Sequence, residues 1–324
     1  MTQKAWPVLA TPPGAAWVRH RERGSPFLLR VMASISLRFG RRASRCILYG
    51  IAVYFFLFAP RARRSSNAYL RLALGRAPTA RDRFRHILTF ATTIHDRVYL
   101  ANGQFEKFKI SVEGADLMMK HLRGRGAMLL GAHMGSFDVM RSVGRLYGGI
   151  RVTMAMYEDN ARKISSILAA INPTMEPDIV SLGRIGAMLD IAERLDQGAF
   201  VGVLGDRTLT DPARADHTLE DSTHRQEQQA VTLLGKRVHL PLGPLRAAAI
   251  LRCPVYFMAG LYRGKNAYHV VFVKVADFSQ VAAGEKRSAV ITAAMEKYAS
   301  LLDEYCRSDP YNWFNFFDFW HASS

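Results

Sequence analysis

The chain has 324 residues, of which 49% are hydrophobic, so it is long enough for one large domain or two small ones. Lys and Arg total 44 against 27 Asp and Glu, which gives a formal net charge of +17. No groove-reading motif or zinc pattern accompanies the arginines, so we expect no nucleic-acid partner. Cys46, Cys253 and Cys306 are far apart and form no Cys-x-x-Cys pair, which argues against a disulfide framework or a structural zinc site.

The positive charge is concentrated towards the N-terminus. Residues 1–110 contain 20 Lys and Arg and 4 Asp and Glu, whereas the remainder contains 24 and 23. Within residues 26–45, polar positions recur every three or four residues with apolar residues between them. These positions are Arg30, Ser34, Arg38, Arg41 and Arg45. The pattern predicts a helix that lies in a membrane interface with its arginines at the lipid headgroups.

An uncharged apolar stretch, residues 47–59, follows this helix and ends at Pro60. A membrane span needs about 20 apolar residues, so we expect the stretch to enter the bilayer without crossing it. Arg61, Arg63 and Arg64 come next, where cations favour an anionic leaflet. We therefore predict that residues 1–107 form a helical membrane-association module. The alternative is a buried helix of a soluble domain with solvated arginines on its outer face.

Residues 108–324 alternate between short apolar runs and segments with helical spacing. The predicted strands are 108–112, 127–132, 152–156, 179–182, 200–204, 254–259 and 269–275, and the predicted helices are 137–146, 161–171, 185–195, 245–251 and 285–306. This order predicts an α/β domain over residues 108–324, with a mostly parallel central sheet flanked by helices. Functional sites in such folds lie at the carboxyl ends of the strands.

His133 and Asp138 form the first candidate site. His133 stands at the end of a predicted strand, and Gly135 and Ser136 permit a tight turn into the helix that carries Asp138. A carboxylate that fixes the tautomer of a neutral imidazole makes the imidazole a general base. We therefore expect His133 to act as the base and Asp138 to be its partner. The alternative is an ordinary histidine in a loop.

A second polar cluster follows the strand at 200–204. Asp206 and Arg207 stand in the segment Gly205-Asp206-Arg207-Thr208, at the carboxyl edge that also carries His133. We expect them to contact substrate, although an ordinary ion pair at a strand end is the other interpretation. Arg184 is a further candidate cation, with a solvated arginine at a helix start as its alternative.

Several motifs occur in an order known from one group of bacterial enzymes. They are the basic apolar N-terminal segment, Gly-Ala-His133-Met-Gly-Ser-Phe-Asp138, Gly205-Asp206-Arg207, Pro241-Leu242-Gly243-Pro244, Cys253-Pro254-Val255-Tyr256, and Pro310-Tyr311-Asn312-Trp313. In these motifs the chain resembles the lysophospholipid acyltransferase superfamily, and within it the lipid A lauroyl/myristoyl acyltransferase branch. Two positions depart from the pattern. The lipid A branch usually has Glu where this chain has Asp138, and the Pro-Glu-Gly-Thr-Arg block of the glycerolipid branch has no match.

The resemblance implies a membrane-associated O-acyltransferase that moves a fatty acyl chain from acyl carrier protein, or from acyl-CoA, to a hydroxyl of a lipid or glycolipid. It implies no metal and no cofactor besides the acyl donor. Gly135 and Ser136 would offer backbone N–H groups to the oxyanion, assisted by Arg184 or Arg207. The first 25 residues lack the continuous apolar core of a secretory signal, so we expect the catalytic part to stay in the cytoplasm. With this expectation, the resemblance implies the cytoplasmic face of a bacterial inner membrane.

Two other functions remain open from the sequence. His133, Asp138 and Asp206, with Asp211, Asp216, His217 and His224, could instead bind zinc or manganese in a metal-dependent hydrolase. The chain could also bind membranes without catalysis. The aromatic segment from Tyr311 to Trp320 is compatible with a lipid-guiding tail or with core packing.

Overall fold

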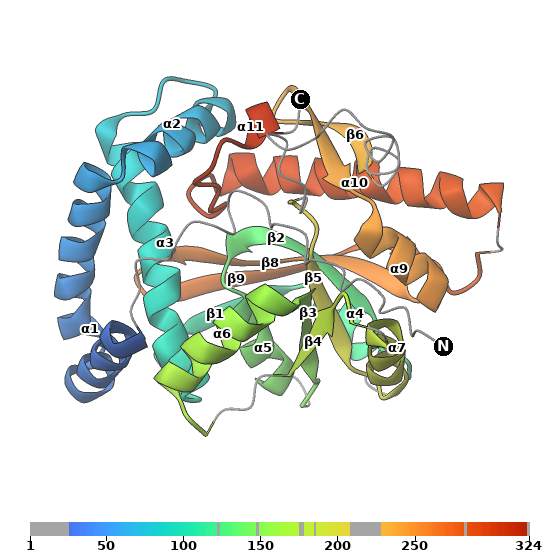
Figure 1. Ribbon diagram of the computed structural model, residues 1–324, viewed down its shortest axis with the longest axis horizontal. Coiled ribbons are helices and arrows are strands. Elements are labelled where there is room, and N and C mark those ends of the chain that lie inside the picture. Colours follow the sequence, from blue (N-terminus) through green and yellow to red (C-terminus); the bar gives the residue numbers. More distant parts are fainter. Residues whose placement is uncertain are drawn as a thin grey trace, which may run out of the picture.

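The computed structural model describes residues 26–121, 124–146, 149–174, 178–184, 186–207, 228–281 and 284–322. Its centre is a seven-stranded sheet with the order β1-β9-β8-β2-β5-β3-β4 (Figure 1). The strands are β1 (Lys109–Glu113), β2 (Met128–Gly135), β3 (Val152–Tyr157), β4 (Ile179–Leu182), β5 (Phe200–Leu204), β8 (Pro254–Gly264) and β9 (Ala267–Asp277). Only the β8–β9 pair is antiparallel among the described pairs of this sheet. The predicted α/β fold with a mostly parallel sheet is therefore confirmed.

Helices cover both faces of the sheet. One face carries α7 (Ala187–Asp196), α9 (Gly243–Leu251), α10 (Glu285–Ser308) and the hairpin of β6 (Gln228–Leu233) and β7 (Lys236–Pro241). The other face carries α5 (Phe137–Leu146), α6 (Glu158–Ile171) and the short α4 (Ala115–Met119). The remaining short elements are η1 (Phe105–Lys107) and α11 (Phe319–Ala322).

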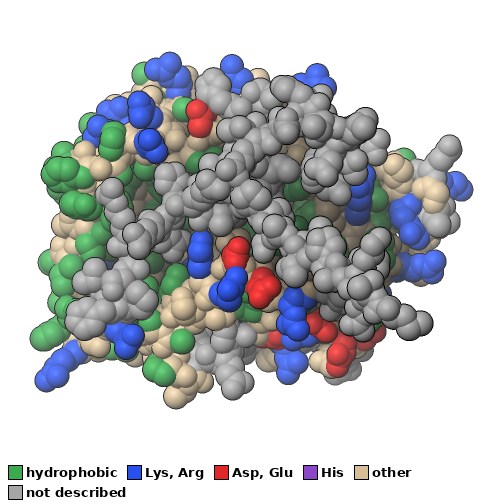
Figure 2. All heavy atoms as spheres, viewed as in Figure 1, with side chains coloured by type: hydrophobic (Ala, Val, Ile, Leu, Met, Phe, Trp, Pro, Cys, Tyr) green, Lys and Arg blue, Asp and Glu red, His purple; other side chains and the backbone are tan. Residues whose placement is uncertain are grey.

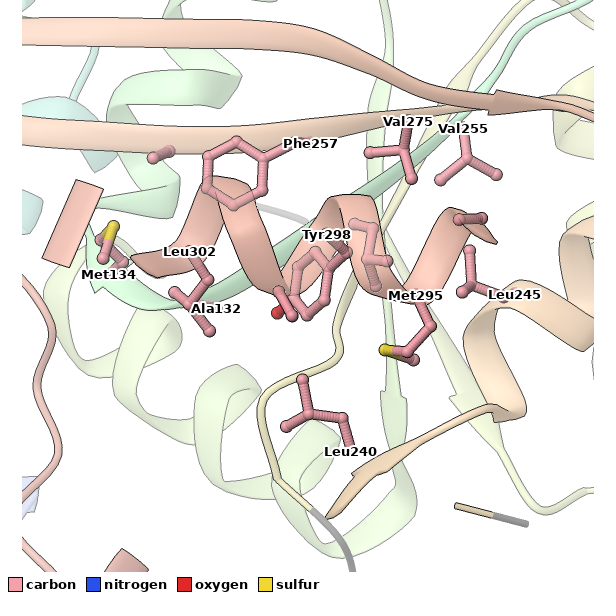
Figure 3. Packing of buried hydrophobic residues seen from close by; sticks show 14 of the residues in the cluster. Ala132, Met134, Leu240, Leu245, Val255, Phe257, Val275, Met295, Tyr298 and Leu302 are labelled. Atoms are coloured by element: carbon pink, nitrogen blue, oxygen red, sulfur yellow. The ribbon is translucent and has the colours of Figure 1, made fainter. Parts of the chain in front are cut away.

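Side chains of the central strands alternate between two cores. Phe257 of β8 packs towards Tyr298 and Leu302 of α10 (Figure 3), whereas the adjacent Tyr256 and Met258 belong to the core on the opposite face. A strand buried on both faces is continuously apolar, which is why these strands could be recognised in the sequence. Burial of each large apolar side chain contributes about 1.5–3 kcal/mol, so this double core fixes the positions of the strand ends.

Three N-terminal helices pack beside the sheet: α1 (Pro26–Phe58), α2 (Pro60–Leu74) and α3 (Ala80–Ala101). Figure 1 shows α1 at the outer edge and α3 between α1 and the sheet. A capping box starts α3, because Thr79 accepts a hydrogen bond from the N–H of Asp82 and the Asp82 side chain accepts one from the N–H of Thr79. Helix α1 bends at Gly40, whose φ is 78°.

The faces of α1 differ from the sequence prediction. The buried face consists of small residues and one leucine (Ala33, Ser36, Ser44, Leu48 and Ala52). Arg41 of the expected headgroup face turns inward and forms a bidentate ion pair with Asp96 of α3, at 2.6 and 2.7 Å. Arg45 donates to the hydroxyl of Tyr262 and to the carbonyl of Lys265. The prediction that Arg41 and Arg45 lie at the lipid headgroups is therefore wrong, because α3 and the β8–β9 hairpin offer them acceptors. The other residues of that predicted face, Arg30, Ser34 and Arg38, are exposed.

The exposed surface of α1 carries many large apolar side chains, beside the exposed Arg30, Arg38 and Arg42. Ten exposed large apolar side chains lie on this one helix: Val31, Leu37, Phe39, Ile47, Tyr49, Val53, Tyr54, Phe55, Leu57 and Phe58. In Figure 2 apolar side chains gather along the edge that α1 forms, with basic side chains above them over α2. Among the described helices, none alone is long and apolar enough to cross a membrane. The pair Leu29–Phe58 and Pro60–Leu74, bent by 91°, meets that criterion together.

Candidate active site

The candidate site lies where β2 and β5 end side by side. These strands pair in parallel from Met128 opposite Val201 to Gly131 opposite Leu204. Continuing this register by two residues brings His133 of β2 next to Asp206, which follows β5. The two residues are 73 positions apart in the sequence, and the sheet order joins them.

Asp206 is the hydrogen-bond partner of His133. The Nδ1 atom of His133 lies 2.9 Å from Oδ1 of Asp206, and the backbone N–H of His133 donates to Oδ2 at 3.0 Å. The indole Nε1–H of Trp313 also donates to Oδ2, at 2.9 Å. Asp206 is 1% exposed, while 34% of the surface of the His133 side chain is accessible. Since Nδ1 faces the buried carboxylate, Nε2 lies at the outer side of the imidazole.

The electrostatics assign protons to this pair. Burial works to raise the pKa of Asp206, but the neighbouring His133 and Arg207 and the Trp313 hydrogen bond together hold it below its usual range. Asp206 is therefore ionised, and Nδ1 of His133 must carry the shared proton. Burial, together with the charge of Arg207, lowers the pKa of His133 below its ordinary value. At neutral pH the imidazole is therefore neutral, with a lone pair on Nε2.

Asp138 does not have the predicted role. Its Oδ2 accepts a hydrogen bond from Nε of Arg97 in α3, at 2.7 Å. The strand β2 continues to Gly135, so the turn into α5 begins two residues after His133 and points the first helical turn towards α3. The hydrogen-bond partner of His133 Nδ1 is Asp206 instead. The prediction of Asp138 as the group that fixes the tautomer of His133 is therefore wrong.

The backbone N–H groups of Gly135 and Ser136 are already engaged. The N–H of Gly135 donates to the carbonyl of Asn312 at 2.9 Å, and that of Ser136 donates to the carbonyl of Gly260 at 2.8 Å. Gly135 has φ 66°, and a Cβ there would lie 2.0 Å from the Gly260 oxygen. Gly135 thus permits a close strand crossing, and the prediction that these two N–H groups form the oxyanion site is wrong.

Arg207 lies beside the pair, whereas Arg184 does not. The guanidinium of Arg207 donates from Nη2 to the carbonyl of Phe314 at 3.1 Å and lies over the ring of Phe317 at 4.6 Å. Its Nε–H is buried and has no hydrogen-bond partner among the described residues. Arg184 is exposed and follows β4, three strands from β2, which corresponds to about 14 Å.

A C-terminal strap, residues 309–317, closes one side of the site. Met134 and Trp313 form an isolated antiparallel bridge, and the N–H of Phe314 donates to the carbonyl of His133 at 2.8 Å. The aromatic segment is packed: Trp313, Phe314 and Phe319 are buried, and Trp313 contacts Tyr69 at 5.1 Å. The structure thus favours core packing for these three rings.

Sequence reasoning did not assign roles to two residues next to the pair. Trp313 belongs to a recognised motif, but nothing local to it indicates a bond to Asp206. His86 of α3 bonds to the carbonyl of Trp313 and gave no sequence signal, because a lone histidine in a helix has many uses.

The remaining predictions concern metals and family. No group of three His, Cys, Asp or Glu suited to a metal ion occurs within the described residues. Asp211, Asp216, His217 and His224 lie outside the described residues. The sequence matches no protein-family model and no curated protein. The fold and site together define an α/β protein with a histidine–aspartate pair at the carboxyl edge of its sheet.

Proposed function

We propose that this protein is a membrane-associated O-acyltransferase in which His133 is the general base and Asp206 its partner. The observation that carries the proposal is the hydrogen bond from His133 Nδ1 to the buried Asp206, because it leaves Nε2 unprotonated on an imidazole whose side chain is 34% exposed. The order of motifs that resembles the lipid A acyltransferase branch supports the choice of reaction. In this proposal Asp206, and not the predicted Asp138, is the carboxylate that bonds to His133, and the chemistry of the reaction is the same.

The reaction requires no covalent enzyme intermediate. Nε2 of His133 accepts the proton of the acceptor hydroxyl as its oxygen attacks the thioester carbonyl. The tetrahedral oxyanion then collapses, the C–S bond breaks, and the imidazolium returns its proton to the departing thiolate. Asp206 stabilises the imidazolium and keeps its orientation, as the aspartate does in a Ser-His-Asp triad.

Arg207 is the proposed cation for the oxyanion. The positive charge of Arg207 lies close enough to His133 to lower its pKa. The buried Nε–H of Arg207 has no hydrogen-bond partner among the described residues. A preorganised donor at a developing oxyanion is worth about 3 kcal/mol of barrier. Gly135 and Ser136 are left out of this role because their N–H groups are engaged.

Support for membrane association comes from the large apolar side chains that α1 exposes, together with its exposed Arg30, Arg38 and Arg42. Small and polar residues face the protein, while Phe39, Tyr54, Leu57 and Phe58 face outward. Water disfavours such a face, whereas a lipid interface accommodates it. Arg61 and Arg64, exposed just beyond the bend, suit anionic headgroups. We place the protein on the cytoplasmic face of a bacterial inner membrane, with acyl carrier protein or acyl-CoA as donor and a lipid or glycolipid as acceptor.

The test compares lipids from cells that carry the native protein or His133→Ala. Mass spectrometry should find one lipid lighter by an acyl group in the variant. Arg184→Ala is the matched control, since this arginine lies away from the pair, and its lipid profile should equal the native one. Identical profiles for the native protein and His133→Ala would overturn the proposal.

The same purified protein separates the alternative functions. Excess chelator should leave acyl transfer intact, whereas it would abolish a metal-dependent hydrolase. A protein that binds vesicles but transfers no acyl group from either thioester donor would be a membrane-binding protein without this catalysis.

A further inference from the structure

Trp313 is held at two points that face different parts of the molecule. Its indole Nε1–H donates to Oδ2 of Asp206 at 2.9 Å, and its backbone carbonyl lies 2.9 Å from Nε2 of His86. The tryptophan is 1% exposed and also packs edge-on against Tyr69 at 5.1 Å and Phe319 at 5.1 Å. The indole N–H therefore has a fixed direction relative to the carboxylate.

His86 has a defined tautomer. A carbonyl oxygen only accepts, so Nε2 of His86 carries the proton, and Nδ1 accepts from the hydroxyl of Ser66 at 2.9 Å. His86 is fully buried and stacks on Phe316 at 4.6 Å. Burial lowers its pKa to about 4, against the opposite effect of the Trp313 carbonyl, so the ring stays neutral. Ser66 and His86 thus connect α2 and α3 to the strap.

We propose that Trp313 is a positioning residue that fixes Asp206 against His133, and that His86 holds Trp313 in this position. The inference rests on the proposed function for its kinetic consequences. Its structural content does not, because it concerns the proton on His133.

The physical reason lies in the two oxygens of Asp206. Oδ2 is held by the Trp313 indole and the His133 backbone N–H, which leaves Oδ1 aimed at Nδ1 of His133. Without the indole, the carboxylate loses one of three donors and becomes more basic. It then attracts the imidazolium more strongly and is less restricted in rotation. Among the described residues, Arg207 is the other charged group that acts on His133, and it opposes protonation in both cases.

The experiment is an NMR titration of protein labelled with ¹⁵N at histidine, with His133 assigned by its loss in His133→Gln. In native protein His133 should be the Nδ1–H tautomer. Trp313→Phe should raise the pKa of His133 by about one unit, because the more basic carboxylate still faces Nδ1. If the protein is an acyltransferase, the same variant should lower kcat about tenfold to hundredfold with little change in KM, as expected for one charge-assisted hydrogen bond.

Trp320→Phe is the matched control, because Trp320 contacts the Trp313 ring at 6.1 Å and its indole N–H has no described partner. Its His133 titration should equal that of the native protein. A Trp320→Phe shift as large as that of Trp313→Phe, or an unshifted Trp313→Phe, overturns the proposal.

Two further variants decide the question if Trp313→Phe does not fold. His86→Leu removes the donor to the Trp313 carbonyl, whereas His86→Gln restores an N–H at a similar place. His86→Leu should shift the His133 titration and His86→Gln should return it; identical titrations in both overturn the proposal. Absence of acyl transfer by the native protein would overturn the proposed function and leave the titration result standing.

Discussion

Asp206→Asn should abolish base catalysis by reversing the tautomer of His133. Oδ2 of Asp206 accepts two N–H groups, from the His133 backbone and the Trp313 indole, whereas the partner of Oδ1 in the described part of the chain is Nδ1 of His133. An asparagine must keep its carbonyl oxygen towards the two donors, so its NH₂ group faces Nδ1. Nδ1 then has to accept, and the proton moves to Nε2, where it blocks removal of the substrate proton.

The expected loss follows from this geometry. The corresponding change in a Ser-His-Asp triad lowers kcat by about 10⁴ through the same tautomer reversal, which equals about 5.5 kcal/mol of barrier. We expect a loss of this order for Asp206→Asn, measured as thiol release from an acyl thioester in the presence of acceptor lipid. Circular dichroism should show an unchanged fold, because an amide fits the space of the carboxylate.

Asp138→Asn is the matched control for the choice of carboxylate. Its amide oxygen can still accept from Nε of Arg97, and no described hydrogen bond joins it to His133. We expect kcat to fall by less than tenfold. The reasoning is refuted if Asp138→Asn is the more damaging variant, or if Asp206→Asn retains a third or more of the native rate.

Three further predictions concern stability and binding. The pKa of buried His86 is lowered to about 4, so the unfolded state binds more protons below pH 6.5. His86 should therefore contribute about 2 kcal/mol to the loss of unfolding free energy from pH 8 to pH 5 in urea, and His86→Gln should reduce the loss by that amount. Gly135→Ala should lower the unfolding free energy by more than 3 kcal/mol in the same assay, because the new Cβ would meet the Gly260 oxygen. Gly149→Ala is the control: Gly149 also has a positive φ, 75°, but no described atom lies near its Cβ position, so this change should cost about 1 kcal/mol. Phe58→Asp should reduce co-sedimentation with anionic vesicles about tenfold, because about 1.5–3 kcal/mol of apolar burial is lost; unchanged binding would show that the end of α1 does not contact lipid.

The strands of the central sheet were predicted well because a strand that is buried on both faces appears in the sequence as a continuous apolar run. Residues 200–204, for example, form an uninterrupted apolar run, and β5 has these same bounds. The hairpin β6–β7 was not predicted, since most of its strand positions are exposed or half-buried and form no continuous apolar run. Its turn consists of Leu234 and Gly235, both with positive φ. Leucine at such a position is uncommon, so the turn gives little signal.

The partner of His133 was not predictable from local spacing. Asp138 is five residues away and looked suitable, but whether it reaches the imidazole depends on where β2 ends. Asp206 is in place because β5 is the neighbour of β2, and the order of strands in a sheet is a property of the whole fold. The sequence did indicate that both residues end strands at one edge, so Asp206 was identified as a site residue without its role.

The arginines of α1 show the same limitation and support the placement of this helix. Periodicity correctly groups Arg41 and Arg45 on one face, but it does not state what that face meets. Asp96 is fully buried, and without Arg41 its charge would lose its ion pair and keep the hydrogen bond from the Tyr268 hydroxyl, so α1 turns this face towards α3. That rotation sends the bulky apolar residues of α1 outward. A helix bound through ions and small residues, with its large apolar side chains outside, is suited to solvation by lipid, and Arg41→Leu should therefore weaken the α1–α3 contact without weakening affinity for vesicles.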